Sequence, residues 1–127
     1  MIQTDLRELV LDEAKTLPFM DGTVKPYEPH ENDEMQMFVF YQPGDSRAYV
    51  AYFGFVANER DGVFEIRRVG VHDTHKGKGW GRAVVECLER IAKACGYDRV
   101  RVEKNKTPAF WAHMGYQPSP AKYEKVI

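Results

Sequence analysis

The spacing of apolar residues changes along this chain, and each change predicts a different element of secondary structure. From Thr4 to Leu17 the apolar positions recur at intervals of three and four, which is typical of a helix that buries one face. Thr4 or Asp5 can cap its start, and Pro18 disfavours its continuation past Leu17. Residues 18–34 hold three prolines and a glycine, and they predict one long loop.

Three strand-like stretches follow the predicted loop. They run over Met35–Gln42, Arg47–Ala57 and Val63–Val71, and short segments rich in turn-forming residues separate them. Strands that are joined by short turns pair as an antiparallel meander, so we expect these three to lie side by side in one sheet.

The apolar period then returns to that of a helix. One continuous stripe is formed by Ala83, Val84, Cys87, Leu88, Ile91 and Ala92. Gly96 can end this helix, and Arg99–Glu103 alternates as a strand does. A strand, a helix and a strand within about 40 residues predict a crossover, so the strands Val63–Val71 and Arg99–Glu103 should be parallel.

The rest of the chain completes an α/β pattern. Pro108 predicts the start of a short helix that extends to Met114, and a last strand is expected within Tyr116–Ile127. The predicted fold class is therefore α/β, with a mixed, mostly antiparallel central sheet that is flanked by helices. A chain of 127 residues is predicted to form a single domain over residues 1–127.

Composition and charge limit the classes of partner that we expect for this domain. The formal net charge of −1 does not favour nucleic acid, and no apolar run approaches the 18 residues of a membrane span. Cys87 and Cys95 fall eight residues apart in the predicted helix, which is about 12 Å and too far for a disulfide. Reduced thiols and the lack of a signal-peptide pattern predict a cytoplasmic protein. We predict no metal site.

The segment most suggestive of chemistry is Lys76-Gly77-Lys78-Gly79-Trp80-Gly81, between a predicted strand and the best predicted helix. Free amides at a helix start favour an anion, and glycines let it approach the backbone closely, so this run predicts a phosphate or pyrophosphate cradle. The alternative is a turn whose glycines serve tight packing. Arg82 stands where a dinucleotide fingerprint needs its last glycine, and a P-loop pattern is absent from the sequence.

These residues also carry a resemblance to a family. Val69-Gly70-Val71, followed by the run from Lys76 to Gly81, resembles the acetyl-CoA signature of the GCN5-related N-acetyltransferase (GNAT) family, with Lys76 in place of the usual Gln or Arg. The segment from Phe110 to Tyr116 resembles the second block of that family. The resemblance covers roughly Val63 to Gln117.

The resemblance implies a parallel strand pair that splays apart and holds acetyl-CoA, the co-substrate, between its strands. The backbone of Val69-Gly70-Val71 would bind pantetheine, and the Val69 N–H would polarise the thioester carbonyl. Trp111 would form a wall for pantetheine, and Asn105 lies near a usual pantetheine contact. The amides expected to bind the pyrophosphate are those of Lys76, Gly77, Lys78, Gly79, Trp80, Gly81 and Arg82.

One residue is a candidate base for the proton transfers of this reaction, and three are candidate acids. Glu65 stands where several family members place a base, and its alternative is a solvated carboxylate on a half-exposed strand, paired with Arg67 or Arg68. Tyr116 is a candidate acid, as are His113 and His72, and the alternative for each is a structural role. Trp111 takes the place of a frequent Tyr, and an indole N–H cannot supply a proton.

The resulting prediction is an N-acetyltransferase that acts on a primary amine of a small molecule, peptide or protein. A non-catalytic acetyl-CoA-binding module and a phosphate-binding adaptor are the alternatives. Glu28–Glu34 is either a solvated acidic loop or a surface that prefers cationic acceptors, and aromatic residues of the strands form core or line the acceptor pocket. Because the pattern begins with a helix, the family's first strand is expected to be missing, and a homodimer is one way to complete the acceptor site.

Overall fold

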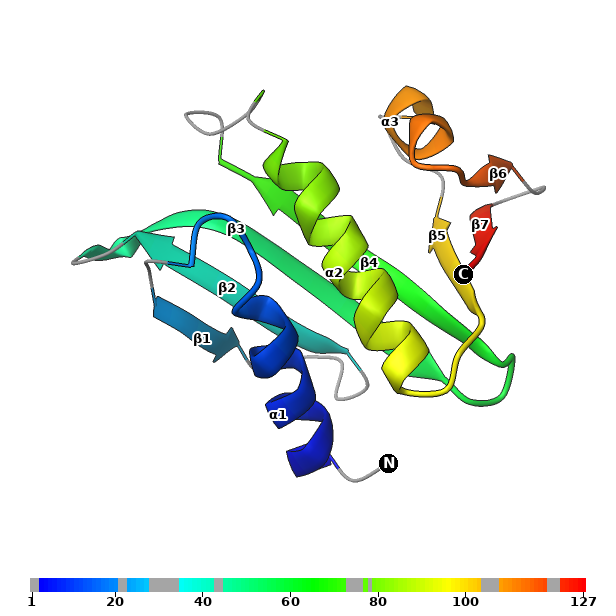
Figure 1. Ribbon diagram of the computed structural model, residues 1–127, viewed down its shortest axis with the longest axis horizontal. Helices are drawn as coiled ribbons and strands as arrows, with labels where there is room; N and C mark the ends of the chain where they lie inside the picture. Colours follow the sequence, from blue (N-terminus) through cyan, green and yellow to red (C-terminus); the bar gives the residue numbers. More distant parts are fainter. Residues whose placement is uncertain are drawn as a thin grey trace.

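This computed structural model describes residues 3–20, 23–27, 35–42, 45–72, 77, 79–103, 108–118 and 122–127. Seven strands of the described part form one sheet in the order β1-β2-β3-β4-β5-β7-β6 (Figure 1). The strands are β1 (Thr23–Tyr27), β2 (Gln36–Gln42), β3 (Asp45–Asn58), β4 (Val63–Val71), β5 (Arg99–Glu103), β6 (Gln117–Pro118) and β7 (Lys122–Val126). The helices are α1 (Gln3–Ala14), α2 (Trp80–Ala94) and α3 (Pro108–His113).

The predicted meander and crossover are both present. β2, β3 and β4 pair antiparallel in sequence order, and β4 pairs with β5 in parallel. The other neighbouring strands, β1 with β2, β5 with β7 and β6 with β7, are antiparallel. The predicted fold class, a mixed and mostly antiparallel sheet flanked by helices, is therefore confirmed.

The prediction of one long loop over residues 18–34 is wrong for part of that segment. β1 lies inside it and pairs with β2 over its whole length, with Pro26 opposite Phe38. A proline is tolerated because β1 is an edge strand, where one side of the backbone needs no ladder partner. The sheet thus has a strand ahead of the predicted meander, although it follows α1 in the chain instead of preceding it.

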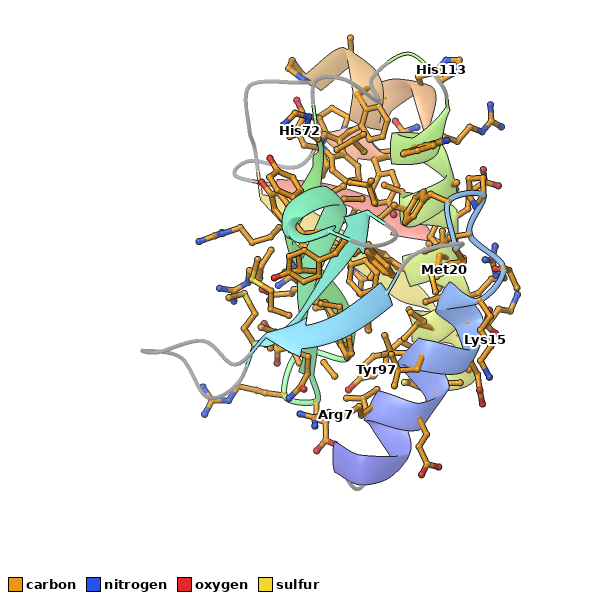
Figure 2. The ribbon with its side chains drawn as sticks, turned by 90° about the vertical axis from the view of Figure 1, so that its left-hand side faces the viewer. Arg7, Lys15, Met20, His72, Tyr97 and His113 are labelled. Carbon is orange, nitrogen blue, oxygen red and sulfur yellow. The ribbon has the colours of Figure 1, made fainter. Side chains whose placement is uncertain are left out.

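Helices α1 and α2 cover one face of the sheet (Figures 1 and 2). The predicted stripe of α2 is buried apart from the half-buried Ala83, and Val85 is buried as well. Against it packs a layer of phenylalanine rings from the strands, made up of Phe38, Phe40, Phe53, Phe55 and Phe64. No described helix is long and apolar enough to cross a membrane.

Two smaller expectations can also be compared with the structure. α1 ends at Ala14, and a tighter turn in which Leu17 N–H donates to the Ala14 carbonyl carries the buried Leu17 side chain onto the core. Both cysteines are free, as predicted, and burial raises the pKa of the Cys87 thiol to about 11. Cys87 is therefore a protonated core residue at neutral pH.

Candidate active site

The site begins where β4 and β5 separate. The two strands pair only from Phe64 to Ile66, opposite Val100 to Val102. At the same point the register of β4 against β3 shifts, because Phe55 faces Ile66 while Gly54 faces Arg68. Arg67 is thus an extra residue in β4, and a bulge of this kind bends a strand and increases its twist. Beyond the bulge, β4 runs on to Val71 without pairing to the described part of β5.

The open edge of β4 presents backbone amides of the predicted residues. His72 N–H donates to the Val50 carbonyl of β3 at 2.9 Å. Successive amides of an extended strand point to opposite edges, so the N–H groups of Val71 and Val69 point away from β3, toward the space between β4 and β5. A sheet edge of this kind can pair with an extended ligand.

The first backbone N–H groups of α2 are a second set of hydrogen-bond donors at this site. Gly79 is the N-cap of α2, with φ 77° and ψ 10°, and no side chain of a described residue caps the helix. The first helical bond runs from Ala83 N–H to the Gly79 carbonyl, so the amides of residues 80–82 have no acceptor within the helix. These amides and the helix dipole favour an anion at this end.

The glycines of this turn are required by their backbone angles. Gly77 has φ +83° and Gly79 has φ +77°, a region that other residues rarely adopt. A Cβ on either would meet nothing within 4 Å in the described part of the chain, so tight packing against these residues does not account for the two glycines. A Cβ on Gly81 would lie 3.6 Å from the Phe110 ring, which places α3 beside the start of α2.

The side chain of Trp111 on α3 is buried together with its polar indole N–H. The residue is 3% exposed and lies between Phe110 and Tyr116, with ring centroids 5.0 and 5.2 Å away. Its buried Nε1–H has no hydrogen-bond partner in the described part of the chain. A buried donor without a partner costs about 1–3 kcal/mol, and a ligand carbonyl could remove that penalty.

The model of the acetyltransferase (GNAT) family matches residues 5–116 of this chain. The chain belongs to the GNAT family. The first of the two sequence blocks that resemble this family forms the open end of β4 and the glycine turn, and the second forms most of α3 and the turn before β6.

Relatives of this GNAT chain agree in fold. A Klebsiella pneumoniae protein described as an acyl-CoA N-acyltransferase aligns over 83% of this chain and 97% of its own, with TM-score 0.63 and 18% identity. A GNAT acetyltransferase from Elizabethkingia anophelis, solved with acetyl-CoA bound, aligns over 85% and 99%, with TM-score 0.62 and 7% identity. N-alpha-acetyltransferase 80 of Mus musculus is 40% identical over 42 residues, which is 33% of this chain and only 13% of that protein.

Glu65, the predicted base, lies in the paired part of β4, before the bulge. It is 3% exposed, so the expectation of a solvated carboxylate is wrong, whereas its expected pairing with Arg67 is confirmed at 2.7 Å between Nη2 and Oε2. Asn58 Nδ2 and Arg101 Nη1 donate to Oε1 at 3.1 and 3.4 Å. Arg101 comes from β5, directly opposite Glu65. The base role of Glu65 stays a prediction.

Tyr116, the predicted acid, is 1% exposed and donates its hydroxyl proton to Glu89 Oε2 at 2.8 Å. Lys125 Nζ lies 3.1 Å from the same carboxylate oxygen. Burial, followed by the charge of Glu89, raises the pKa of Tyr116 far above its usual value. The phenol is therefore neutral at physiological pH with its proton engaged, and its catalytic role stays a prediction.

The other predicted residues divide into two groups. His113 is exposed at the end of α3, and His72 is half-buried beside Tyr49, with ring centroids 5.2 Å apart. Lys76, Lys78 and Asn105, and the acidic loop Glu28–Glu34, lie outside the described residues. Sequence reasoning missed the contact of Tyr52 with Gly70, because the pairing of these two residues depends on the bulge at Arg67.

A stability measurement at high pH tests the environment of Tyr116. A phenol whose pKa is raised by folding contributes stability that is complete below its unfolded value, near 10, and is lost as the pH rises above it. Tyr116→Phe should lower the free energy of unfolding by about 1 kcal/mol at pH 7, through loss of the bond to Glu89. The deficit should shrink between about pH 10 and 11 in denaturant titrations. A constant deficit would contradict the assignment.

Proposed function

We propose that this GNAT chain transfers the acetyl group of acetyl-CoA to a primary amine of a small molecule, peptide or protein. The observation that carries the proposal is the joint occurrence of an open β4 edge and an uncapped start of α2. The first suits the extended amide chain of pantetheine, and the second suits a pyrophosphate.

The described residues fit acetyl-CoA as the donor. The amides of residues 79–82 would hold the pyrophosphate, and the outward N–H of Val71 would pair with pantetheine. The indole N–H of Trp111, which has no acceptor among the described residues, would give its hydrogen bond to a carbonyl of the ligand. The amides of residues 76–78 and the Asn105 side chain stay part of this proposal from the sequence.

The chemistry requires little covalent participation by the protein. The lone pair of a neutral amine attacks the thioester carbonyl carbon, a C–N bond forms, the C–S bond breaks and the sulfur leaves with the electron pair. The Val69 N–H, which points to the open edge, would stabilise the negative charge that develops on the carbonyl oxygen. Holding both reactants in line supplies much of the remaining acceleration.

The mechanism also requires two proton transfers. The amine must lose a proton to a base, and the departing sulfur is stabilised by a proton donor. Glu65 and Tyr116 are our candidates, although both are held by other side chains in this structure. That engagement favours a second candidate function, an acetyl-CoA-binding module without turnover.

Two measurements on the wild-type chain test the proposal. Calorimetric titration of acetyl-CoA should show binding at one site per chain, and thiol release should be detected with at least one member of a panel of primary amines. Binding without thiol release from any amine would favour the binding module. If acetyl-CoA does not bind, the proposed cofactor site is wrong and the transferase proposal falls with it.

A further inference from the structure

Three aromatic side chains gather where the first half of β3 lies beside the end of β4. Tyr49 packs against Tyr52 with ring centroids 5.6 Å apart, and against His72 with centroids 5.2 Å apart, both edge to face. All three side chains are half-buried, so each keeps part of its surface accessible. In the core, by contrast, the phenylalanines of the same strands are fully covered. This aromatic cluster is therefore available to a ligand.

The cluster lies directly over the segment assigned to the thioester. Tyr52 faces Gly70 across the strand pair. A Cβ placed on Gly70 would lie 2.3 Å from Cε1 and Cζ of the Tyr52 ring and 2.5 Å from its hydroxyl oxygen. The ring thus crosses the backbone between Val69 and Val71, and only a glycine leaves room for it.

Among the described residues, the helices cover one face of this segment and leave the other to an acceptor. α2 packs against β4 on the face that carries the phenylalanine core, and Trp80 and Phe19 fill that side with ring centroids 4.9 Å apart. Figure 2 shows α1 and Met20 on that same side of the sheet, with His72 at the end of β4 away from them. The amine must therefore approach over the aromatic cluster.

The charges on this face argue against an acceptor with several cationic groups. Arg68 pairs with Gly54, as Gly70 pairs with Tyr52, so the exposed Arg68 side chain shares the face of the cluster. The carboxylate of β4, Glu65, is five residues before Gly70, which is about 15 Å along a strand, and Arg67 already pairs with it. The described residues near this segment therefore present aromatic surface to an acceptor, and not carboxylates.

We propose that Tyr49, Tyr52 and His72 form the acceptor subsite, and that it takes a primary monoamine carried on an aromatic or similarly large apolar group. The inference rests on the proposed transferase function and adds the substrate class. Edge and face contacts of two tyrosine rings with such a group are worth about tenfold in binding.

The test compares 2-phenylethylamine with propylamine, which has the same amine and a small alkyl group. Wild type should show a kcat/KM at least about tenfold higher for 2-phenylethylamine. Tyr49→Ala should remove most of this preference, Tyr49→Phe should keep it, and Kd for acetyl-CoA should be unchanged in both. Tyr97→Ala is the matched control, because Tyr97 is a half-buried tyrosine on the helix side, packed on Phe64.

The outcomes separate the two proposals. Turnover of both amines at equal kcat/KM, or a preference that survives Tyr49→Ala, would overturn the aromatic subsite and leave the transferase intact. Calorimetric titration of 2-phenylethylamine into the CoA-loaded protein gives a readout that does not depend on turnover or on any variant. Failure of that amine to bind more tightly than propylamine would also overturn the subsite, whereas failure of acetyl-CoA to bind would overturn the proposed function itself.

Discussion

Gly79→Asp is expected to weaken acetyl-CoA binding at least about 100-fold in a calorimetric titration. Gly79 is the N-cap of α2 and has φ +77°, so the new carboxylate would stand among the free amides at the helix start. It would neutralise the dipole and repel the pyrophosphate at a few ångströms, and such repulsion near a protein surface amounts to several kcal/mol. Nothing in the described part of the chain lies within 4 Å of the new Cβ, so the cost to the fold is the strain of a positive φ, which Asp tolerates better than most residues.

Two further variants separate charge from backbone strain. Gly79→Asn has the same shape as Gly79→Asp and tolerates a positive φ equally well, but it carries no charge and should lose much less affinity. Gly62→Asp introduces the same residue at φ +67° in the exposed turn between β3 and β4, where nothing lies within 4 Å. That control should bind acetyl-CoA like wild type. Equal losses in Gly79→Asp and Gly62→Asp would mean that α2 does not hold the pyrophosphate.

Glu65→Ala is expected to cost about 3 kcal/mol of unfolding free energy, or roughly 10 °C in Tm. Glu65 is buried and accepts hydrogen bonds from Arg67, Arg101 and Asn58. Removing it takes this carboxylate from two arginines whose side chains are only 32% and 18% exposed. Asp61 and Glu124 still pair with Arg101, which keeps the loss below that of an isolated buried pair.

Glu86→Ala is the matched control for stability. Its carboxylate pairs with Arg82 one turn away on α2, and both side chains are about half exposed or more. Solvent screens such a pair, so thermal unfolding should show a change of about 0.5 kcal/mol or less. Similar losses in both variants would mean that the Glu65 network contributes no more than a surface pair.

A second substitution at position 65 tests whether Glu65 acts as the base. Glu65→Gln keeps the shape and one acceptor oxygen but cannot take a proton. Because Glu65 is a candidate base, this change should lower kcat/KM by about 100-fold or more and remove the acidic limb of the pH profile. A loss within about tenfold would instead assign a structural role to the carboxylate, which Arg67 holds before the bulge.

Local patterns along the chain were sufficient to predict α2, the glycine turn and the paired strands of the meander. The burial of the α2 stripe follows from a period that neighbouring residues establish by themselves, and the positive φ of Gly77 and Gly79 is a property of the turn. The strand β1 was missed because its pairing with β2, and not its own composition, makes Thr23–Tyr27 a strand.

The features that shape the candidate site were decided by contacts between distant segments. The open edge of β4 exists because one extra residue, Arg67, shifts the register against β3, and a register is a relation between two strands that neither sequence states alone. Glu65 is buried because β5 brings Arg101 opposite it, and Tyr52 reaches the backbone of Gly70 because the bulge pairs them. The sequence by itself determined the family and the glycine turn before α2, since both are encoded in short segments of the chain. The tertiary structure alone decided which side chains lie at the open edge of β4, since that depends on strand pairing across the sheet.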